Sequence, residues 1–206
     1  MSRLTNAVAA AVLAALVLTG CAPAQTDEAD TGTSATEGTG AESTAGTDAE
    51  SGDETDAEPA AGDVIDGDGY SLTVPEGWMQ VAQAPTGADV AAMDSNDADG
   101  FADNLNVVIS PAGLVSLDVV EQAGPAEIEA AGGTDVVVGE RITAAGNEIA
   151  HVTANATAQG VDYVVEQYAL SSTDQTYLVT FSFSPEVPQS DRVALAESVL
   201  ATWAWS

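Results

Sequence analysis

The sequence EIAHVTANATAQGVDYVVEQYALSSTDQTYLVTFSFS, residues 148–184, decides the fold class of this chain. Together with the residues just before it, this stretch holds four segments that are rich in β-branched residues or alternate between apolar and polar ones: residues 136–142, 148–156, 161–170 and 176–184. The gaps between them contain residues that favour hairpin turns: Ala145-Gly146-Asn147, Gln159-Gly160 and residues 171–175. Strands joined by such short turns predict an antiparallel meander.

Two further strands are expected upstream of the meander. Tyr70 to Val74 alternates between apolar and polar residues, and Pro75-Glu76-Gly77 then turns the chain before Trp78. Residues 105–110 form a short apolar run, which suits a strand that is buried on both faces. The predicted sheet therefore extends well beyond the meander.

Two segments have helical spacing instead. The first covers residues 116–131, and Pro125 is expected to kink it or to divide it in two. Its candidate inward residues are Leu117, Val120, Ala123 and Ile128. The second covers residues 188–203, with Ser190 or Asp191 as its N-cap. Its apolar stripe consists of Val193, Ala196, Val199, Leu200 and Trp203. An antiparallel sheet covered by such helices is an α+β domain.

Two short motifs resemble those of the PsbP-like superfamily. Tyr70-Ser-Leu-Thr-Val-Pro-Glu-Gly-Trp78 is similar to its opening strand and Pro-x-Gly-Trp turn, and Phe101-Ala-Asp-Asn-Leu-Asn-Val107 to its second marker. The superfamily includes the photosystem II PsbP subunit, the Mog-type Ran-binding factor and LpqN-type actinobacterial lipoproteins. The resemblance covers residues 65–206. It implies an antiparallel sheet between helices, an α/β/α sandwich, and mainly non-enzymatic members that bind partners. It transfers no catalytic residues.

The first twenty residues have the layout of a bacterial export signal. Arg3 supplies a positive start, and residues 7–18 form an apolar run. This run suits a signal peptide and is too short for a transmembrane helix, which needs about 20 residues. Leu18-Thr19-Gly20 and Cys21 then resemble the lipobox of bacterial lipoproteins. We predict that lipoprotein signal peptidase recognises these residues, that the chain is cut before Cys21, and that the Cys21 thiol receives diacylglycerol.

Cys21 is the only cysteine in the chain, so it cannot form an internal disulfide. The alternative is an ordinary secretory signal, which would leave one free thiol without a use. Two or three acyl chains such as palmitate on Cys21 exceed what stable membrane anchoring requires. The sequence thus predicts a protein that is lipid-anchored at the outer, extracytoplasmic face of the cell membrane.

The next segment has the composition of a linker. Residues 22–62 contain no Leu, Ile, Val, Phe, Tyr, Trp or Met, and consist mostly of Ala, Thr, Ser, Gly, Asp and Glu. Such a segment cannot bury enough apolar surface to offset the entropy of ordering, so we expect it to be disordered. Its many Thr and Ser residues leave an O-glycosylated stalk as the alternative. The chain thus divides into a signal peptide (1–20), a linker (21–62) and one folded domain (63–206).

The charge of the chain limits its partners. It has 33 acidic residues against three Arg and no Lys, with a formal net charge of -30. Such a chain does not bind nucleic acid by neutralising phosphates, and anionic lipid headgroups repel it. The excess of Ala, Gly, Thr and Asp, with no Lys, indicates a high-GC, actinobacterial-type genome or growth in salt. We therefore expect contact with the membrane through the lipid anchor, and with other proteins of the cell envelope.

The sequence offers little for catalysis. The only histidine, His151, lies inside a predicted strand, and no nucleophile elbow, P-loop or dinucleotide-binding motif is present. Acylation of the one cysteine and the lack of Lys remove thiol and lysine mechanisms. Hydrolysis by paired carboxylates is the remaining enzymatic alternative. We expect no enzymatic activity and no catalytic residues.

One acidic loop has the oxygen ligands that Ca²⁺ prefers. Its candidate ligands are Asp94, Asn96, Asp97, Asp99 and Asp103. The loop does not match an EF-hand, because with Gly100 at the sixth position the twelfth is Asn106, where an EF-hand has Glu. The other interpretation is a solvated loop. We expect no cofactor, with Ca²⁺ as the alternative.

The aromatic residues allow two interpretations. Those that could line an apolar pocket between sheet and helix, or else build the core, are Trp78, Trp203, Trp205, Phe101, Phe181 and Phe183. We therefore predict a membrane-anchored, non-catalytic binding or accessory module, and as the alternative a carrier of a lipid or another small hydrophobic ligand.

Overall fold

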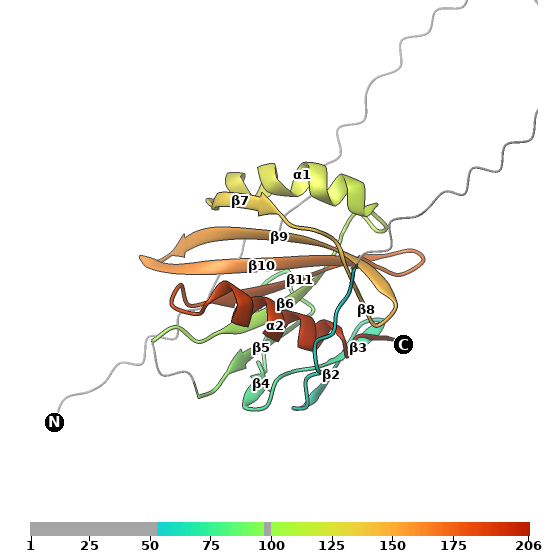
Figure 1. Ribbon diagram of the computed structural model, residues 1–206, viewed down its shortest axis with the longest axis horizontal. Helices are drawn as coiled ribbons and strands as arrows, with labels where there is room; N and C mark the ends of the chain where they lie inside the picture. The colour runs from blue at the N-terminus through green and yellow to red at the C-terminus, as the bar shows by residue number, and fades with distance from the viewer. Residues whose placement is uncertain (1–52, 97–99) are drawn as a thin grey trace, which may run out of the picture.

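The computed structural model describes residues 53–96 and 100–206 (Figure 1). This part of the chain contains two helices and two β-sheets. Neither helix in it has the length and apolar character needed to cross a membrane. The predicted signal peptide and most of the predicted linker lie outside the described residues.

The larger sheet has nine strands. They are β1 (Asp53–Glu54), β4 (Trp78–Gln80), β5 (Val90–Asp94), β6 (Asn104–Ile109), β7 (Thr134–Val138), β8 (Ile142–Ala144), β9 (Asn147–Ala158), β10 (Val161–Ser171) and β11 (Thr176–Phe183). Their order is β1-β8-β9-β10-β11-β6-β5-β4, and β7 also pairs with β9. The pair of β1 and β8 is parallel, whereas the other pairs are antiparallel.

The predicted meander is confirmed. β9, β10 and β11 pair in sequence, so that Tyr168 of β10 lies opposite His151 on one side and Val179 on the other. Gln159 and Gly160 form the turn between β9 and β10 with φ angles of 54° and 83°. A two-residue I′ turn requires positive φ at both positions, which Gly adopts without strain. The α+β class predicted from these segments is therefore correct.

The strand predicted over residues 136–142 is two strands, and this prediction was wrong. β7 ends at Val138 and β8 begins at Ile142, although both pair with the same side of β9. Gly139 donates its N–H to the carbonyl of His151, and Ile142 lies opposite Ile149. Two residues, Glu140 and Arg141, therefore face a single residue of β9, and this mismatch interrupts the strand.

A smaller sheet completes the β-structure. Its strands are β2 (Val64–Gly67), β3 (Tyr70–Thr73) and β12 (Ala204–Trp205), in the order β12-β3-β2. All its pairs are antiparallel, and Trp205 lies opposite Tyr70. The strand expected from Tyr70 is thus present, and the end of the chain is held against it.

Helix α1 (Leu117–Ala130) remains one element although Pro125 lies inside it, so it is not divided. Val120 and Ile128 are buried on either side of the proline, and their packing on β9 holds both halves of the helix on the same sheet. Leu117 is partly buried in this contact. Gly124, not the expected Ala123, is the buried residue in the middle of the helix.

Helix α2 (Gln189–Leu200) begins one residue after Pro188, which is its N-cap. No side chain caps it, so the predicted cap by Ser190 or Asp191 was wrong. Both lie in the first turn, where the Ser190 hydroxyl bonds the Asp191 carboxylate instead. Ala196, Val199 and Leu200 are buried, as the apolar stripe predicted.

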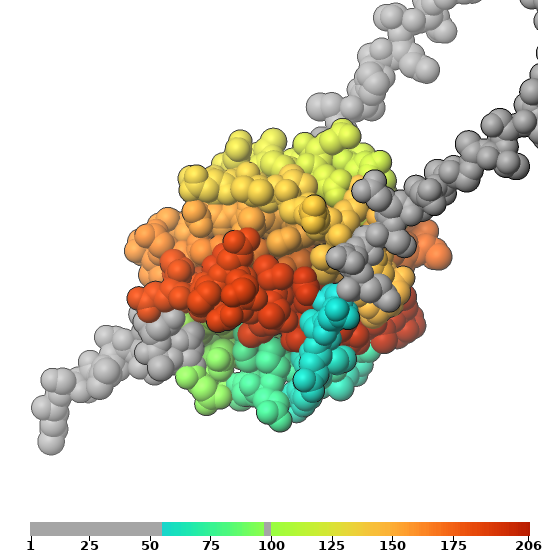
Figure 2. Space-filling view, in the orientation of Figure 1, coloured from blue at the N-terminus to red at the C-terminus, as the bar shows by residue number. Residues whose placement is uncertain are grey.

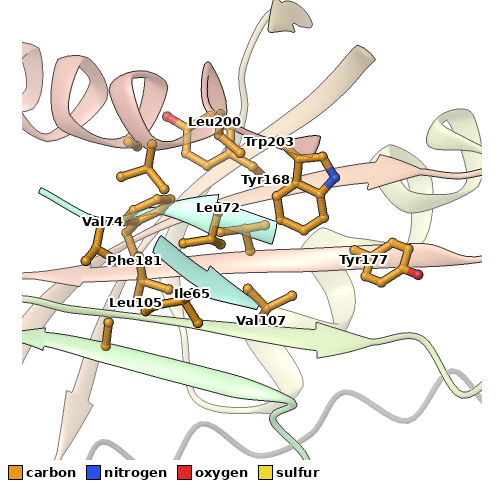
Figure 3. Packing of buried hydrophobic residues seen from close by; sticks show 14 of the residues in the cluster. Ile65, Leu72, Val74, Leu105, Val107, Tyr168, Tyr177, Phe181, Leu200 and Trp203 are labelled. Carbon is orange, nitrogen blue, oxygen red and sulfur yellow. The ribbon is translucent and has the colours of Figure 1, made fainter. Parts of the chain in front are cut away.

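The helices cover opposite faces of the large sheet (Figure 1). α1 packs on Ala150, Val152 and Ala154 of β9, whereas Ile149 faces the main core on the other side. α2 lies across that second face together with the small sheet (Figure 2). Aliphatic and aromatic side chains from both sheets and from α2 fill the space between them (Figure 3). The arrangement is the expected sandwich.

The first described residues are attached to the domain by hydrogen bonds. Thr55 donates its N–H to the Thr143 carbonyl at 2.9 Å and its hydroxyl to Glu197 at 2.5 Å. Ala60 donates its N–H to the Ser198 carbonyl at 2.9 Å. Thr55 and Ala60, which the composition assigns to the linker, are therefore bonded to β8 and α2.

Candidate functional site

The residues of the predicted lipidation site, Leu18, Thr19, Gly20 and Cys21, lie outside the described residues. Cleavage and acylation there remain predictions. Asp97 and Asp99 of the acidic loop also lie outside them.

The described carboxylates of the acidic loop bond to backbone groups. Asp94 accepts the N–H of Asn96 at 2.8 Å, and Asp103 accepts the N–H of Ser184 at 2.9 Å. The backbone of Asp94 also donates to the carbonyl of Asp103 at 2.8 Å. Within the described ranges, no group of three His, Cys, Asp or Glu side chains is placed to hold a metal ion. The described residues thus brace the loop, and Ca²⁺ binding there stays a prediction.

Five of the six aromatic residues that the sequence suggested as a pocket lining are buried. Trp78, Trp203, Phe181 and Phe183 belong to the main core, and Phe101 stacks on Tyr163 in a separate cluster. Trp205 differs from them, because 38% of its surface is exposed. The aromatic residues therefore mainly build the core, and Trp205 is the one that reaches the surface.

The Trp205 ring is held in place from several sides. Its indole Nε1–H donates to Asn147 Oδ1 at 3.0 Å, at the start of β9. Its centroid lies 5.3 Å from that of Tyr177, with the planes tilted by 49°, and 5.3 Å from that of Trp203 in an edge contact. Trp203 in turn stacks on Tyr70 at 4.3 Å. Figure 3 shows Trp203 and Tyr177 beside the aliphatic core, with the Tyr177 hydroxyl pointing away from it.

Trp205 lines an open hollow between the β10–β11 turn and the end of β12. The hollow has a volume of about 570 Å³. Its lining residues are Gly69, Ser171, Ser172, Thr173, Asp174, Tyr177, Trp205 and Ser206. This size lies within the range of small-ligand sites, roughly 300–1,000 Å³. The aromatic wall and the hydroxyl-rich rim make it our candidate binding site.

The β10–β11 turn fixes the polar rim of the hollow. The Ser172 hydroxyl donates to Asp174 Oδ1 at 3.0 Å and accepts the N–H of Gln175 at 3.1 Å. Thr173 and Asp174 are exposed at the tip of this turn. The Asp174 carboxylate is thereby held beside the aromatic wall, where a bound group would meet it.

The hollow lies in a negative field. Burial raises the pKa of the Tyr177 hydroxyl, and the carboxylates of Asp174, Asp68 and Asp89 raise it further. Tyr177 is therefore neutral at physiological pH and donates its hydroxyl to the Asp68 carbonyl at 3.3 Å. Burial, followed by the nearby Asp89 carboxylate, likewise raises the pKa of Tyr70.

A second group of polar residues is buried beneath α2. Glu166 of β10 has no exposed side-chain surface, and its two carboxylate oxygens accept hydrogen bonds from different elements. His151 Nε2 of β9 lies 2.8 Å from Oε2, and Arg192 Nε of α2 lies 2.9 Å from Oε1. The His151 ring also stacks on Tyr168 at 4.4 Å. The carboxylate thus links two strands to the helix.

Burial on its own raises the pKa of Glu166. The hydrogen bonds and charges of His151 and Arg192 outweigh burial and hold that pKa below its usual value. A carboxylate whose two oxygens are engaged is a poor general base, so we interpret this group as structural. Our sequence reasoning missed it, although alternation along β10 places Glu166 in phase with Tyr168 on the inward face.

The other arginine of the described residues is engaged on the opposite side of the sheet. Arg141 bonds carboxylates of both α1 and β9: Asp118, Glu121 and Glu148. It sits in the break between β7 and β8, from which its side chain reaches α1. Both arginines of the folded region are therefore paired with carboxylates of the same chain.

Several solved structures are similar to this one. LpqN of Mycobacterium tuberculosis, which is involved in cell envelope biogenesis, is 14% identical with a TM-score of 0.50, over 67% of this chain and 84% of LpqN. CyanoP, the PsbP of Synechocystis sp. PCC 6803, is 15% identical with a TM-score of 0.47, over 67% and 87% of the two chains. A Bacteroides thetaiotaomicron structure is 11% identical with a TM-score of 0.42 over 66% of this chain, which spans 45% of that structure.

No curated protein matches the sequence significantly. The sequence profile of the PsbP family, by contrast, matches residues 64–186, which is more than half of the chain. The matched region runs from β2 through the meander to the loop before α2. This chain therefore belongs to the PsbP family.

Proposed function

We propose that this protein is a lipid-anchored accessory module of the cell envelope that binds a protein partner through the hollow beside Trp205. The observation behind this proposal is the exposure of Trp205, whose ring is fixed by Asn147, Tyr177 and Trp203. A rigid, partly exposed tryptophan is typical of the centre of protein interfaces, because it gains contact area at little cost in entropy.

The proposed anchor supports a role that depends on proximity. Acylation of Cys21 would confine the domain to the membrane, and the linker would let it search the nearby volume. Tethering raises the effective concentration of a binding site toward neighbours in the same compartment. The shared fold of LpqN, a protein involved in cell envelope biogenesis, supports the same location.

The chemistry of the hollow supports binding over catalysis. Its lining offers one carboxylate side chain, Asp174, together with hydroxyl groups and aromatic rings. Paired-carboxylate hydrolysis needs two acidic groups that face the same bond. The alternative role as a carrier of a hydrophobic ligand gains no support from the space between the large sheet and α2, which core side chains fill.

Site-specific photocrosslinking in the native envelope tests the proposal. A photoreactive amino acid at Thr173, on the rim of the hollow, is expected to capture one or a few envelope proteins. The same label at Ala126, on the exposed side of α1, is the control and should not capture them. The Trp205→Ala variant should abolish capture, whereas Val64→Ala, at an apolar residue that is 66% exposed elsewhere, should not. Equal capture from Thr173 and Ala126, or none from Thr173, would contradict the proposal.

A separate experiment tests the anchor. The wild-type protein should incorporate labelled palmitate and sediment with membranes, and Cys21→Ala should lose both properties. Incorporation of palmitate by the Cys21→Ala variant would refute acylation at this residue.

A further inference from the structure

We propose that the hollow beside Trp205 binds a lysine or arginine side chain of the partner protein. This inference rests on the proposed function, since it names the chemistry by which the partner is recognised. It follows from three features of the described residues: the carboxylates around the hollow, its aromatic wall, and the engagement of both arginines elsewhere.

The carboxylates give the hollow its charge preference. Asp174 lies on the rim, and Asp68 and Asp89 lie close enough to act on the Tyr177 hydroxyl. Asp89 Oδ2 already accepts the N–H of Asp68 at 2.9 Å and the Tyr70 hydroxyl at 3.0 Å. Asp174 Oδ1 accepts the Ser172 hydroxyl, whereas its Oδ2 bonds none of the described residues. Asp174, the one carboxylate side chain in the lining of the hollow, is therefore available to a ligand.

The aromatic wall adds a second preference for cations. The faces of aromatic rings attract Lys and Arg side chains through their quadrupoles, and Trp does so most strongly. The exposed part of the Trp205 ring and the edge of Tyr177 both line the hollow beside Asp174. A cationic group in the hollow would therefore contact a carboxylate and an indole at once.

No basic residue of the described chain competes for this site. Arg192 bonds Glu166 and the Val187 carbonyl beneath α2. Arg141 bonds three carboxylates on the other side of the sheet. The charge of the hollow is therefore not neutralised from within the described residues, and a basic partner complements it.

The hydroxyl groups distinguish between kinds of cation. The Ser171 and Ser172 hydroxyls are engaged with Thr176 and within the turn, so the Thr173 hydroxyl is the acceptor on the rim that the N–H donors of lysine and arginine can meet. A quaternary ammonium, such as a choline headgroup, has no N–H donor. The lining thus fits a basic protein side chain better than a choline lipid.

NMR titration of the full chain tests this inference through the indole N–H signal of Trp205, which Trp205→Phe identifies by its loss. The probes are the Nα-acetyl amides of arginine and lysine, the amide of citrulline as a neutral match for arginine, and choline. The basic amides should shift this signal with dissociation constants roughly two- to fivefold below that of the citrulline amide. Equal affinity for the arginine and citrulline amides, or tighter binding of choline, would overturn the inference.

Two substitutions with the same charge change locate the site. Asp174→Asn should weaken binding of the arginine amide roughly two- to fivefold. Glu186→Gln removes one exposed carboxylate beyond the far end of β11 and should leave the affinity within measurement error. Equal losses in both variants would mean that the amide responds only to overall charge, which would also overturn the inference.

The two proposals fail in different ways. Specific crosslinks from Thr173 without a preference for basic amides would support the partner-binding function and refute recognition of a cationic side chain. A preference for basic amides without crosslinks from Thr173 would support a cation site and refute the binding of a protein partner there.

Discussion

The two arginines of the folded region bind carboxylates in opposite settings. The Arg192 side chain is 11% exposed and bonds Glu166, which is fully buried. The Arg141 side chain is 27% exposed and bonds three carboxylates, of which Asp118 is 74% exposed. Arg141 has more ionic partners than Arg192, but its side chain and those of its partners are more exposed to solvent.

The difference shows that the number of partners is a poor guide to the stability they provide. Exposed ion pairs contribute about 0–1 kcal/mol, because water screens them and ordering long side chains costs entropy. Breaking a buried pair by removing one member leaves an uncompensated charge, at a cost of about 3–5 kcal/mol. We therefore expect the Glu166 group to decide the stability of this domain, and the Arg141 group to adjust it slightly.

The largest expected effect comes from Glu166→Gln. This change keeps the shape of the side chain but leaves the buried Arg192 without its counter-charge. We expect a loss of about 3–5 kcal/mol in the free energy of unfolding, measured by urea denaturation followed by circular dichroism. Glu186→Gln, the same change at an exposed glutamate, is the control and should cost less than about 0.5 kcal/mol. Similar losses of unfolding free energy in Glu166→Gln and Glu186→Gln would contradict the larger role of the buried group.

The difference in unfolding free energy between wild type and Glu166→Gln should also change with pH. This change should be smaller than the difference itself, and its direction follows from the pKa of Glu166. The pKa of Glu166 in the folded state lies below its usual value of 4.5, so folding favours the ionised form. Its contribution is thus complete above pH 4.5 and is lost as the pH falls through the lower, folded-state pKa. The gap in unfolding free energy between wild type and Glu166→Gln should therefore narrow below pH 4.5. A gap that widens with acid would contradict the assigned direction.

The smallest effect is expected from Arg141→Met, which removes the partly exposed guanidinium while keeping an apolar stem. We expect a loss of about 1 kcal/mol or less, shrinking further in 1 M NaCl because salt screens exposed charges. Arg192→Met provides the matched comparison and should cost several times more at either salt concentration. Equal losses for the two arginines would show that burial does not separate these sites.

The parts of the fold that were predictable depend on local signals. Alternation and turn residues located β9, β10 and β11 because strand period and hairpin geometry act over a few neighbouring residues. The break around Gly139 was not predictable in this way, since it arises from two residues facing one on β9. Continuity of α1 through Pro125 likewise depends on packing against the sheet.

The candidate sites were less predictable, because they join distant segments. Glu166 shows its inward phase in the sequence, but its partner Arg192 lies on another element, 26 residues away. Trp205 resembles the core tryptophans in the sequence, and only the pairing of β12 with β3 places it beside the β10–β11 turn. Contacts of this kind depend on topology, which the local pattern does not contain.

The attachment of Thr55 to β8 and α2 has a mechanical consequence. A pull on the chain before residue 53 would load the two residue pairs of β1 and β8 first, and then the Thr55 hydrogen bonds with Thr143 and Glu197. The two residue pairs of β1 and β8 are few compared with the ladders of the long meander, so this attachment should yield before the sheet does. Under tension this attachment would detach first, so the tether would lengthen while the domain stays folded.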